Sequence, residues 1–105
     1  MMNGMNMGKI MKQAQEMQKK MAAEQGEIEN QDFTGVSPEE MVTVTFGGNR
    51  KMKDMQVKPE AIDPDDPDML SDLVISAVND ALAKIEETTQ NKMGKYTKGM
   101  NIPGM

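Results

Sequence analysis

The sequence predicts an α+β domain in which two helices flank a small three-stranded antiparallel sheet. Three patterns carry this prediction: apolar residues at 3-4 spacing through residues 7–28, strict alternation from Met41 to Phe46, and a second 3-4 stripe through residues 70–85. Helices at both ends with strands between them are typical of the α+β class. The 105 residues have the length of one domain, which we place at residues 8–94.

The first helix is expected from about Gly8 to a point between residues 25 and 30, after a flexible lead-in at residues 1–7. An a/d seam, the pattern of helix–helix contacts, runs along it through Met7, Ile10, Ala14, Met17, Met21, Glu24 and Ile28. We expect Ile10, Ala14, Met17 and Met21 to pack in the core or in a dimer contact. Gly26 is either just past the helix end or a weak point inside the helix.

Three strands are expected after this helix. Residues 29–35 have only Phe33 as a strong apolar anchor, so a strand there would be a polar edge strand. The segment 37–40 is expected to form a turn or one short helical turn. Met41 to Phe46 is the clearest strand, and the alternating residues that we assign to the core or the dimer contact are Val42, Val44 and Phe46.

The glycines and asparagine of residues 47–49 predict a hairpin turn. The strand that returns from it, residues 50–57, carries Met55 and Val57 on one face and Met52 on the other. This pattern leaves two alternatives open, a β-bulge or a strand that is apolar on both faces.

A second helix is expected after a rigid acidic connector at residues 59–67. Asp66 and Pro67 have the residue types of an N-cap and a first helical position. The helix is expected to run to about Met93, with Gly94 ending it and residues 95–105 forming a flexible tail. Asn79, beside the apolar stripe, is expected to cap the backbone of a loop or strand.

Composition argues against catalysis. The chain has no Cys and no His, and it contains neither a Gly-rich phosphate loop nor a serine elbow. The acids of residues 63–68 are better explained as helix caps than as a calcium loop, and Asp80 with Lys84 as a surface ion pair. We therefore predict no enzyme activity, no metal, no cofactor and no small-molecule substrate.

The sequence also carries no sign of a membrane or secretory address. No apolar run approaches the roughly 18 residues of a membrane span. The first 20 residues lack the apolar segment and cleavage site of a signal peptide. We expect a cytoplasmic protein without a membrane partner.

Charge is segregated along the chain. The net charge is −5, yet residues 9–20, 50–58 and 92–98 each carry a local charge of +3. Aromatic stacking platforms for single strands are missing, whereas duplex binding through phosphates needs only positioned cations. The chain has fourteen methionines and only three aromatic residues. Because methionine side chains are flexible, they define the packing of a core poorly. A dimer would bury apolar surface that a single chain leaves exposed, so we expect self-association. A dimer would double each basic cluster.

Seven segments, in order along residues 5–105, resemble the YbaB/EbfC family of bacterial nucleoid-associated proteins. They are residues 11–18 (MKQAQEMQ), the Thr34-Gly35 turn, Val42-Thr43-Val44 before the hairpin, Ile62-Asp63-Pro64, residues 70–74 (LSDLV), residues 77–81 (AVNDA) and residues 99–104 (GMNIPG). The resemblance implies a cytoplasmic, nucleoid-associated homodimer, shaped like tweezers, that binds duplex DNA and affects DNA shape and gene expression.

The resemblance also implies that DNA is bound by the projecting helices and the tails. Carried over to this sequence, the candidate DNA-binding residues are Lys9, Lys12, Gln13, Lys19, Lys20, Lys92, Lys95 and Lys98. Gln13, Gln15 and Gln18 are also able to reach adenine edges or phosphate oxygens. The alternative function is a protein-interaction adaptor that uses the Met-rich first helix and binds no nucleic acid.

Overall fold

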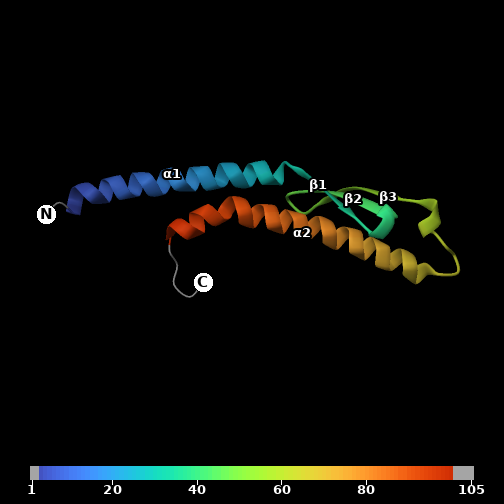
Figure 1. Ribbon diagram of the computed structural model, residues 1–105. Helices are drawn as coiled ribbons and strands as arrows, with labels where there is room; N and C mark the ends of the chain where they lie inside the picture. Colours follow the sequence, from blue (N-terminus) through green and yellow to red (C-terminus); the bar gives the residue numbers. More distant parts are fainter. Residues whose placement is uncertain (1–2, 101–105) are drawn as a thin grey trace.

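The computed structural model describes the backbone of residues 3–100 and the side chains of residues 7–96, and it confirms the α+β prediction. The chain forms an elongated molecule of 78 × 28 × 16 Å with the sheet at one end and the two helices projecting from it (Figure 1). The elements in order are α1 (Asn3–Glu29), β1 (Asp32–Val36), the 3-10 turn η1 (Pro38–Glu40), β2 (Val42–Gly47), β3 (Met52–Val57), the 3-10 turn η2 (Pro59–Ala61) and α2 (Pro67–Met100).

The sheet is antiparallel, in the order β1-β2-β3, so β1 lies at an edge as expected. In β2 and β3, Val42 is opposite Val57 and Val44 is opposite Met55. A register shift at Thr45/Phe46 then places Met52 opposite Phe46. Since residues directly opposite each other share a face, this irregularity brings Met52 to the same face as Met55 and Val57. Of the two alternatives for β3, the bulge is the one that forms.

The core lies between β1, β2 and the sheet-proximal half of α2. Val42 and Val44 are fully buried, as are the small residues Ala77 and Ala81 of α2 and the larger Ile85. These alanines let the helix approach the sheet closely because they present little side-chain volume. Alternating burial along β2 therefore follows from the alternating side chains that predicted the strand.

Both helices extend further than predicted. α1 begins at Asn3, so residues 3–7 are helical, and it runs through Gly26 to Glu29. α2 continues through Gly94 to Met100, so the predicted helix end and the predicted tail are wrong for residues 95–100. Gly94 stops no helix here because Tyr96, two residues later, is buried at 8% exposure. Tertiary packing outweighs the modest cost of glycine in a helix. The remaining tail residues, 101–105, and residues 1–2 lie outside the described part of the chain.

The start of α2 agrees with the prediction from the local sequence. Met69 N–H donates to Asp66 Oδ1 at 3.2 Å, which is the predicted N-cap of α2. Thr34 and Gly35 are an exception, since they lie inside strand β1 rather than in a turn. Within residues 3–100, neither helix holds a stretch that is long and apolar enough to cross a membrane.

Candidate nucleic-acid interface

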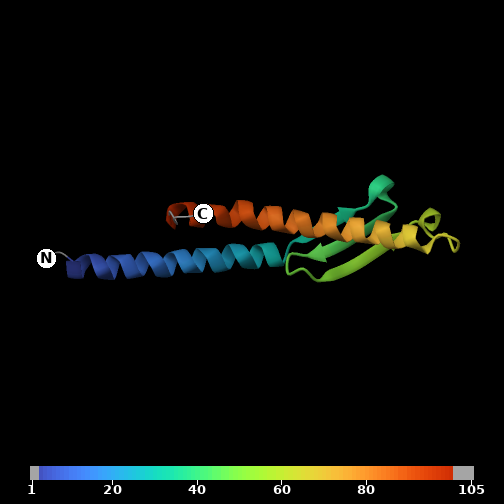
Figure 2. The ribbon, with the colours of Figure 1, turned by 90° about the horizontal axis from the view of Figure 1, so that it is seen from below.

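The end of the molecule away from the sheet consists of two helical segments that run antiparallel. Figures 1 and 2 both show the C-terminal half of α1 beside the C-terminal part of α2, while the N-terminal half of α1 continues past the point where α2 ends. The direction of both helices is set near the sheet. Ile28 of α1 is buried in the same core cluster as Ile85 of α2. Segments that are far apart in the sequence thus form one projecting arm.

Three side chains link the two helices along this arm. Lys95 Nζ of α2 forms a salt bridge with Glu24 Oε1 of α1, and it lies 5.3 Å from the centroid of the Tyr96 ring. The hydrogen bond from Lys95 lowers the pKa of Glu24, and the same hydrogen bond raises the pKa of Lys95. Burial is the main cause of the raised pKa of Tyr96. We call Glu24, Lys95 and Tyr96 the interhelical clamp.

Beyond the clamp, α1 stands free within the described chain. Every residue from Met7 to Lys20 is exposed, whereas Met21 is half-buried and Ile28 is 3% exposed. Ile10, Ala14 and Met17 are therefore outside the core of a single chain, and their part in a dimer contact stays a prediction. The residues of this segment are therefore accessible to a partner.

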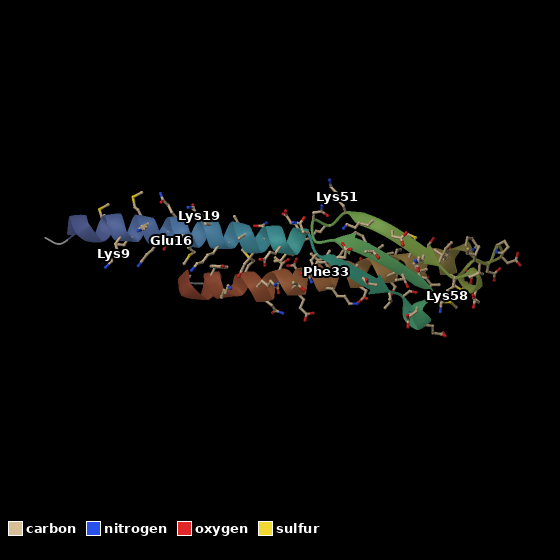
Figure 3. All side chains as sticks on the ribbon, turned by 90° about the horizontal axis from the view of Figure 1, so that it is seen from above. Lys9, Glu16, Lys19, Phe33, Lys51 and Lys58 are labelled. Atoms are coloured by element: carbon tan, nitrogen blue, oxygen red, sulfur yellow. The ribbon has the colours of Figure 1, made fainter. Side chains whose placement is uncertain are left out.

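The cations of α1 share one face of this free segment. At 3.6 residues per turn, the lysines fall within an arc of about 100°, and they are Lys9, Lys12, Lys19 and Lys20. Gln13 and Glu16 lie on the same face. Figure 3 shows Lys9, Glu16 and Lys19 along the part of α1 that is far from the sheet, while Lys51 and Lys58 lie over the sheet. Such a face is suited to phosphates because it needs no deep pocket.

The candidate lysines of α2 have different surroundings. Lys92 is exposed near the arm, and Lys95 is held by Glu24 in the clamp. Lys98 lies in the last turns of α2, and its side chain is outside the described part. The structure therefore brings the predicted lysines to one end of the molecule, but it gives Lys95 a role in joining the helices. The one acid in the a/d seam, Glu24, was the signal in the sequence for this contact.

Two of the four cations of the third basic cluster, residues 50–58, are engaged within the chain. Arg50 forms a salt bridge with Glu86 at 3.0 Å, and Lys53 forms one with Asp32 at 2.6 Å. The acids concentrate at the opposite end from the arm, around η1, η2 and the start of α2 (Figure 1). Exposed members of this acidic end are Glu39, Glu40, Glu60, Asp63, Asp65, Asp66, Asp68 and Asp72. The molecule is therefore electrically polar along its length.

The Asp80–Lys84 pair predicted from the sequence forms at 3.2 Å and also holds strand β1. Asp80 Oδ2 accepts a hydrogen bond from Val36 N–H at 3.0 Å, and this bond lowers the pKa of Asp80. Lys84 Nζ donates to Thr34 O at 2.8 Å. The side chain that bonds a strand backbone is thus Asp80, whereas the sequence had suggested Asn79, which is exposed. These contacts fix the direction in which α2 leaves the sheet.

The remaining candidates for a ligand site are a cluster of acids and a small hollow. Among the described side chains, no group of three or more acids is arranged to hold a metal ion. The hollow, of about 160 Å³, lies between the end of α1, the β2–β3 hairpin and Thr89. It is smaller than the roughly 300 Å³ at which typical ligand pockets begin, and we assign no ligand to it.

A model of the YbaB/EbfC DNA-binding family matches residues 2–100. The chain belongs to the YbaB/EbfC family. This family is one of DNA-binding proteins and not of enzymes, which confirms two predictions from the sequence.

Relatives of this chain include named nucleoid-associated proteins. One from Lactobacillus delbrueckii subsp. bulgaricus is 57% identical over 99 residues, covering 94% of this chain and 91% of the relative. Nucleoid-associated protein LL0120 of Lactococcus lactis is 52% identical over 96 residues, with 91% and 97% covered. The solved structure of uncharacterized protein HP0035 from Helicobacter pylori has a TM-score of 0.70 at 22% identity, covering 84% of this chain and 92% of that one. This similarity shows that the two chains share a fold.

Proposed function

We propose that this protein works in the nucleoid as a homodimer that binds duplex DNA through phosphate contacts and DNA shape, altering DNA conformation and influencing nucleoid organisation and gene expression. The observation that carries the proposal is the basic arm. Lysines from both ends of the sequence lie at one end of a 78 Å molecule, and eight of its 17 acids lie at the other. Family membership and the names of the relatives support the nucleoid as the site of action.

The sheet supports the dimer. Strand β3 is an edge strand, and Met52 and Met55 on its core-side face are 41% and 38% exposed. α2 covers β1 and β2, so this part of the face has no helix over it in the single chain. Unpaired edges and exposed apolar surface both favour a second copy. A dimer joined here would carry two basic arms.

The proposal is tested by salt titration of binding to a labelled duplex of random sequence. If a dimer neutralises about 4–8 phosphates, log affinity should fall with log salt at a slope of about −4 to −7. A flat response, or no binding at about 50 mM salt, would contradict the DNA proposal and favour the adaptor alternative. Sedimentation at micromolar concentration tests the dimer, and a monomer there would remove it.

Two matched double variants locate the interface. Lys9→Gln with Lys19→Gln removes two cations from the arm, and Lys51→Gln with Lys58→Gln removes two from the sheet end (Figure 3). Both change the net charge equally, so a difference between them reports position. The arm variant should weaken binding to all duplexes alike and make the slope shallower by up to about 3.6 per dimer, because each neutralised phosphate contributes about 0.9. Equal effects of the two variants would show that the arm is not the interface.

A further inference from the structure

The outer edge of strand β1 carries backbone groups that β2 does not use. Ser37 N–H, just past the end of β1, donates to Val42 O at 2.9 Å, so the backbone of Ser37 faces β2. Successive residues of an antiparallel strand alternate in the direction of their N–H and C=O groups. Residues 33 and 35 therefore also face β2, whereas Asp32, Thr34 and Val36 direct these groups away from the sheet.

Two side chains of α2 occupy this outer edge. Val36 N–H donates to Asp80 Oδ2 at 3.0 Å, and Lys84 Nζ donates to Thr34 O at 2.8 Å. The two side chains also form a salt bridge with each other at 3.2 Å, which holds both of them at the edge. Hydrogen bonds in which one partner is charged are stronger than those between neutral groups. A strand that arrives from another chain would have to displace both.

The two contacts leave little for such a strand to bind. In an antiparallel pair, each hydrogen-bonded residue uses both its N–H and its C=O. One of these two groups is already taken at Thr34 and at Val36, so Asp32 alone among the outward residues keeps both within the described chain. One residue is too short a contact for a stable pair of strands.

The opposite edge of the sheet, along β3, is different. Lys58 N–H donates to Met41 O at 2.9 Å, so the same alternation directs the backbone groups of Met55 and Val57 outward. No side chain in the described part of the chain forms a hydrogen bond with these outward groups. The sheet thus has one open edge and one edge that α2 caps.

We propose that Asp80 and Lys84 cap the β1 edge against strand addition and thereby limit assembly to two chains. The inference rests on the proposed dimer, which joins at β3, and adds the reason why that dimer does not grow. A sheet with two open edges is able to add a neighbour at each of them. With one edge capped, two chains that join at their β3 edges form a closed pair with a cap at either end.

A double variant that keeps the net charge tests the cap. Asp80→Ala with Lys84→Ala removes both bonds to β1, and alanine maintains the helix. In sedimentation, wild type should stay at twice the chain mass of 11.6 kDa, whereas the double variant should at least double that assembly as its concentration rises. The matched control, Arg50→Ala with Glu86→Ala, removes a 3.0 Å salt bridge and should remain a dimer. A role of Asp80 and Lys84 in stability alone would leave the double variant at twice the chain mass, and that result would overturn the proposal.

A proline tests whether the growth takes place at β1. Adding Thr34→Pro to the double variant removes an outward N–H that no ladder bond uses, and proline on an edge strand opposes strand addition. This triple variant should return to twice the chain mass. Continued growth would show that the larger species join elsewhere, and it would overturn the assignment to β1.

Amide hydrogen exchange tests the cap in the wild-type protein, without any substitution. The Val36 amide should be protected because it donates to Asp80, whereas the Thr34 amide points the same way and should exchange rapidly. A protected Thr34 amide would show that a second chain pairs with this edge, which would overturn the proposal. A wild-type protein that sediments as a monomer would instead refute the dimer of the proposed function.

Discussion

Gly35→Ala is the substitution through which the packing of α2 on the sheet is tested most directly. Gly35 lies in β1 under α2, and an added Cβ would be 2.2 Å from Ala77 O and 2.5 Å from Ala81 N. Both obstacles are backbone atoms, so no side-chain rotation relieves the clash. Reaching an ordinary contact of 3.4 Å requires α2 to move away from β1 by about 1.2 Å.

The expected cost follows from this displacement. Overpacking of a close contact destabilises a protein by about 1–3 kcal/mol. A shift of about 1.2 Å also takes the 3.0 Å bond between Val36 N–H and Asp80 out of range, and the loss of such a bond costs about 1–2 kcal/mol. We therefore expect Gly35→Ala to lower the free energy of unfolding by about 2–5 kcal/mol, a large fraction of the stability of a small domain.

Urea unfolding followed by circular dichroism, at one fixed chain concentration, measures this loss. The matched control is Gly26→Ala in α1, where an added Cβ meets nothing within 4 Å. That change should stabilise the protein by about 0.5–1 kcal/mol, because alanine is the better helix residue. If the free energy of unfolding of Gly35→Ala is within about 0.5 kcal/mol of the wild-type value, the close approach of α2 to β1 is wrong.

Two further predictions concern titration. The pKa of Asp80 is lowered in the folded state, so its carboxylate stabilises the fold above its unfolded value near 3.8 and this contribution is lost as pH falls through the folded pKa. Urea unfolding between pH 7 and 3 measures the difference in free energy of unfolding between wild type and Asp80→Asn. This difference should be constant down to about pH 5 and shrink below about pH 4. A difference that grows below pH 4 would contradict the contact between Asp80 and Val36. Tyr96 is the single tyrosine, so ultraviolet absorption reports its ionisation directly. Glu24→Gln should lower the raised pKa of Tyr96 by removing a nearby negative charge, and an unchanged titration would show that the clamp is not formed.

Much of the fold follows from local patterns that the sequence displays. Alternation in residues 42–46 identifies the central strand, the Gly-Gly-Asn turn positions the hairpin, and Asp66 with Pro67 starts α2 where the structure starts it. These signals succeed because each is decided by neighbours along the chain. A strand face, a turn and an N-cap need no knowledge of distant residues.

The helix ends could not be predicted in the same way. Gly94 is a local stop signal, but α2 continues because Tyr96 is buried and Lys95 reaches Glu24 on another helix. The a/d seam of α1 shows a related limit of periodicity. It identifies one apolar face, yet Ile28 on that face is buried and Ile10 is 60% exposed. Spacing tells which side of a helix is apolar and not what covers it.

The candidate site was predictable as a set of charges and not as an arrangement. Clusters of lysine were evident at both ends of the sequence, and the antiparallel helices bring them to one end of the molecule. What spacing could not show is the pairing of Lys95 with Glu24, since those residues are remote in sequence. The division between lysines that face solvent and a lysine that joins two helices appears only when α1 and α2 are placed together.

The separation of basic arm and acidic end has a consequence for DNA covered by this protein. In the complex that we propose, each chain adds a net charge of −5, even though its cations are the groups proposed to contact the phosphates. A coated duplex therefore becomes more negative and carries its acids outward. Two coated duplexes repel each other within a Debye length of about 8–10 Å. Under this proposal coverage alone keeps neighbouring duplexes apart, and only a dimer that binds one duplex with each of its two arms would bring them together.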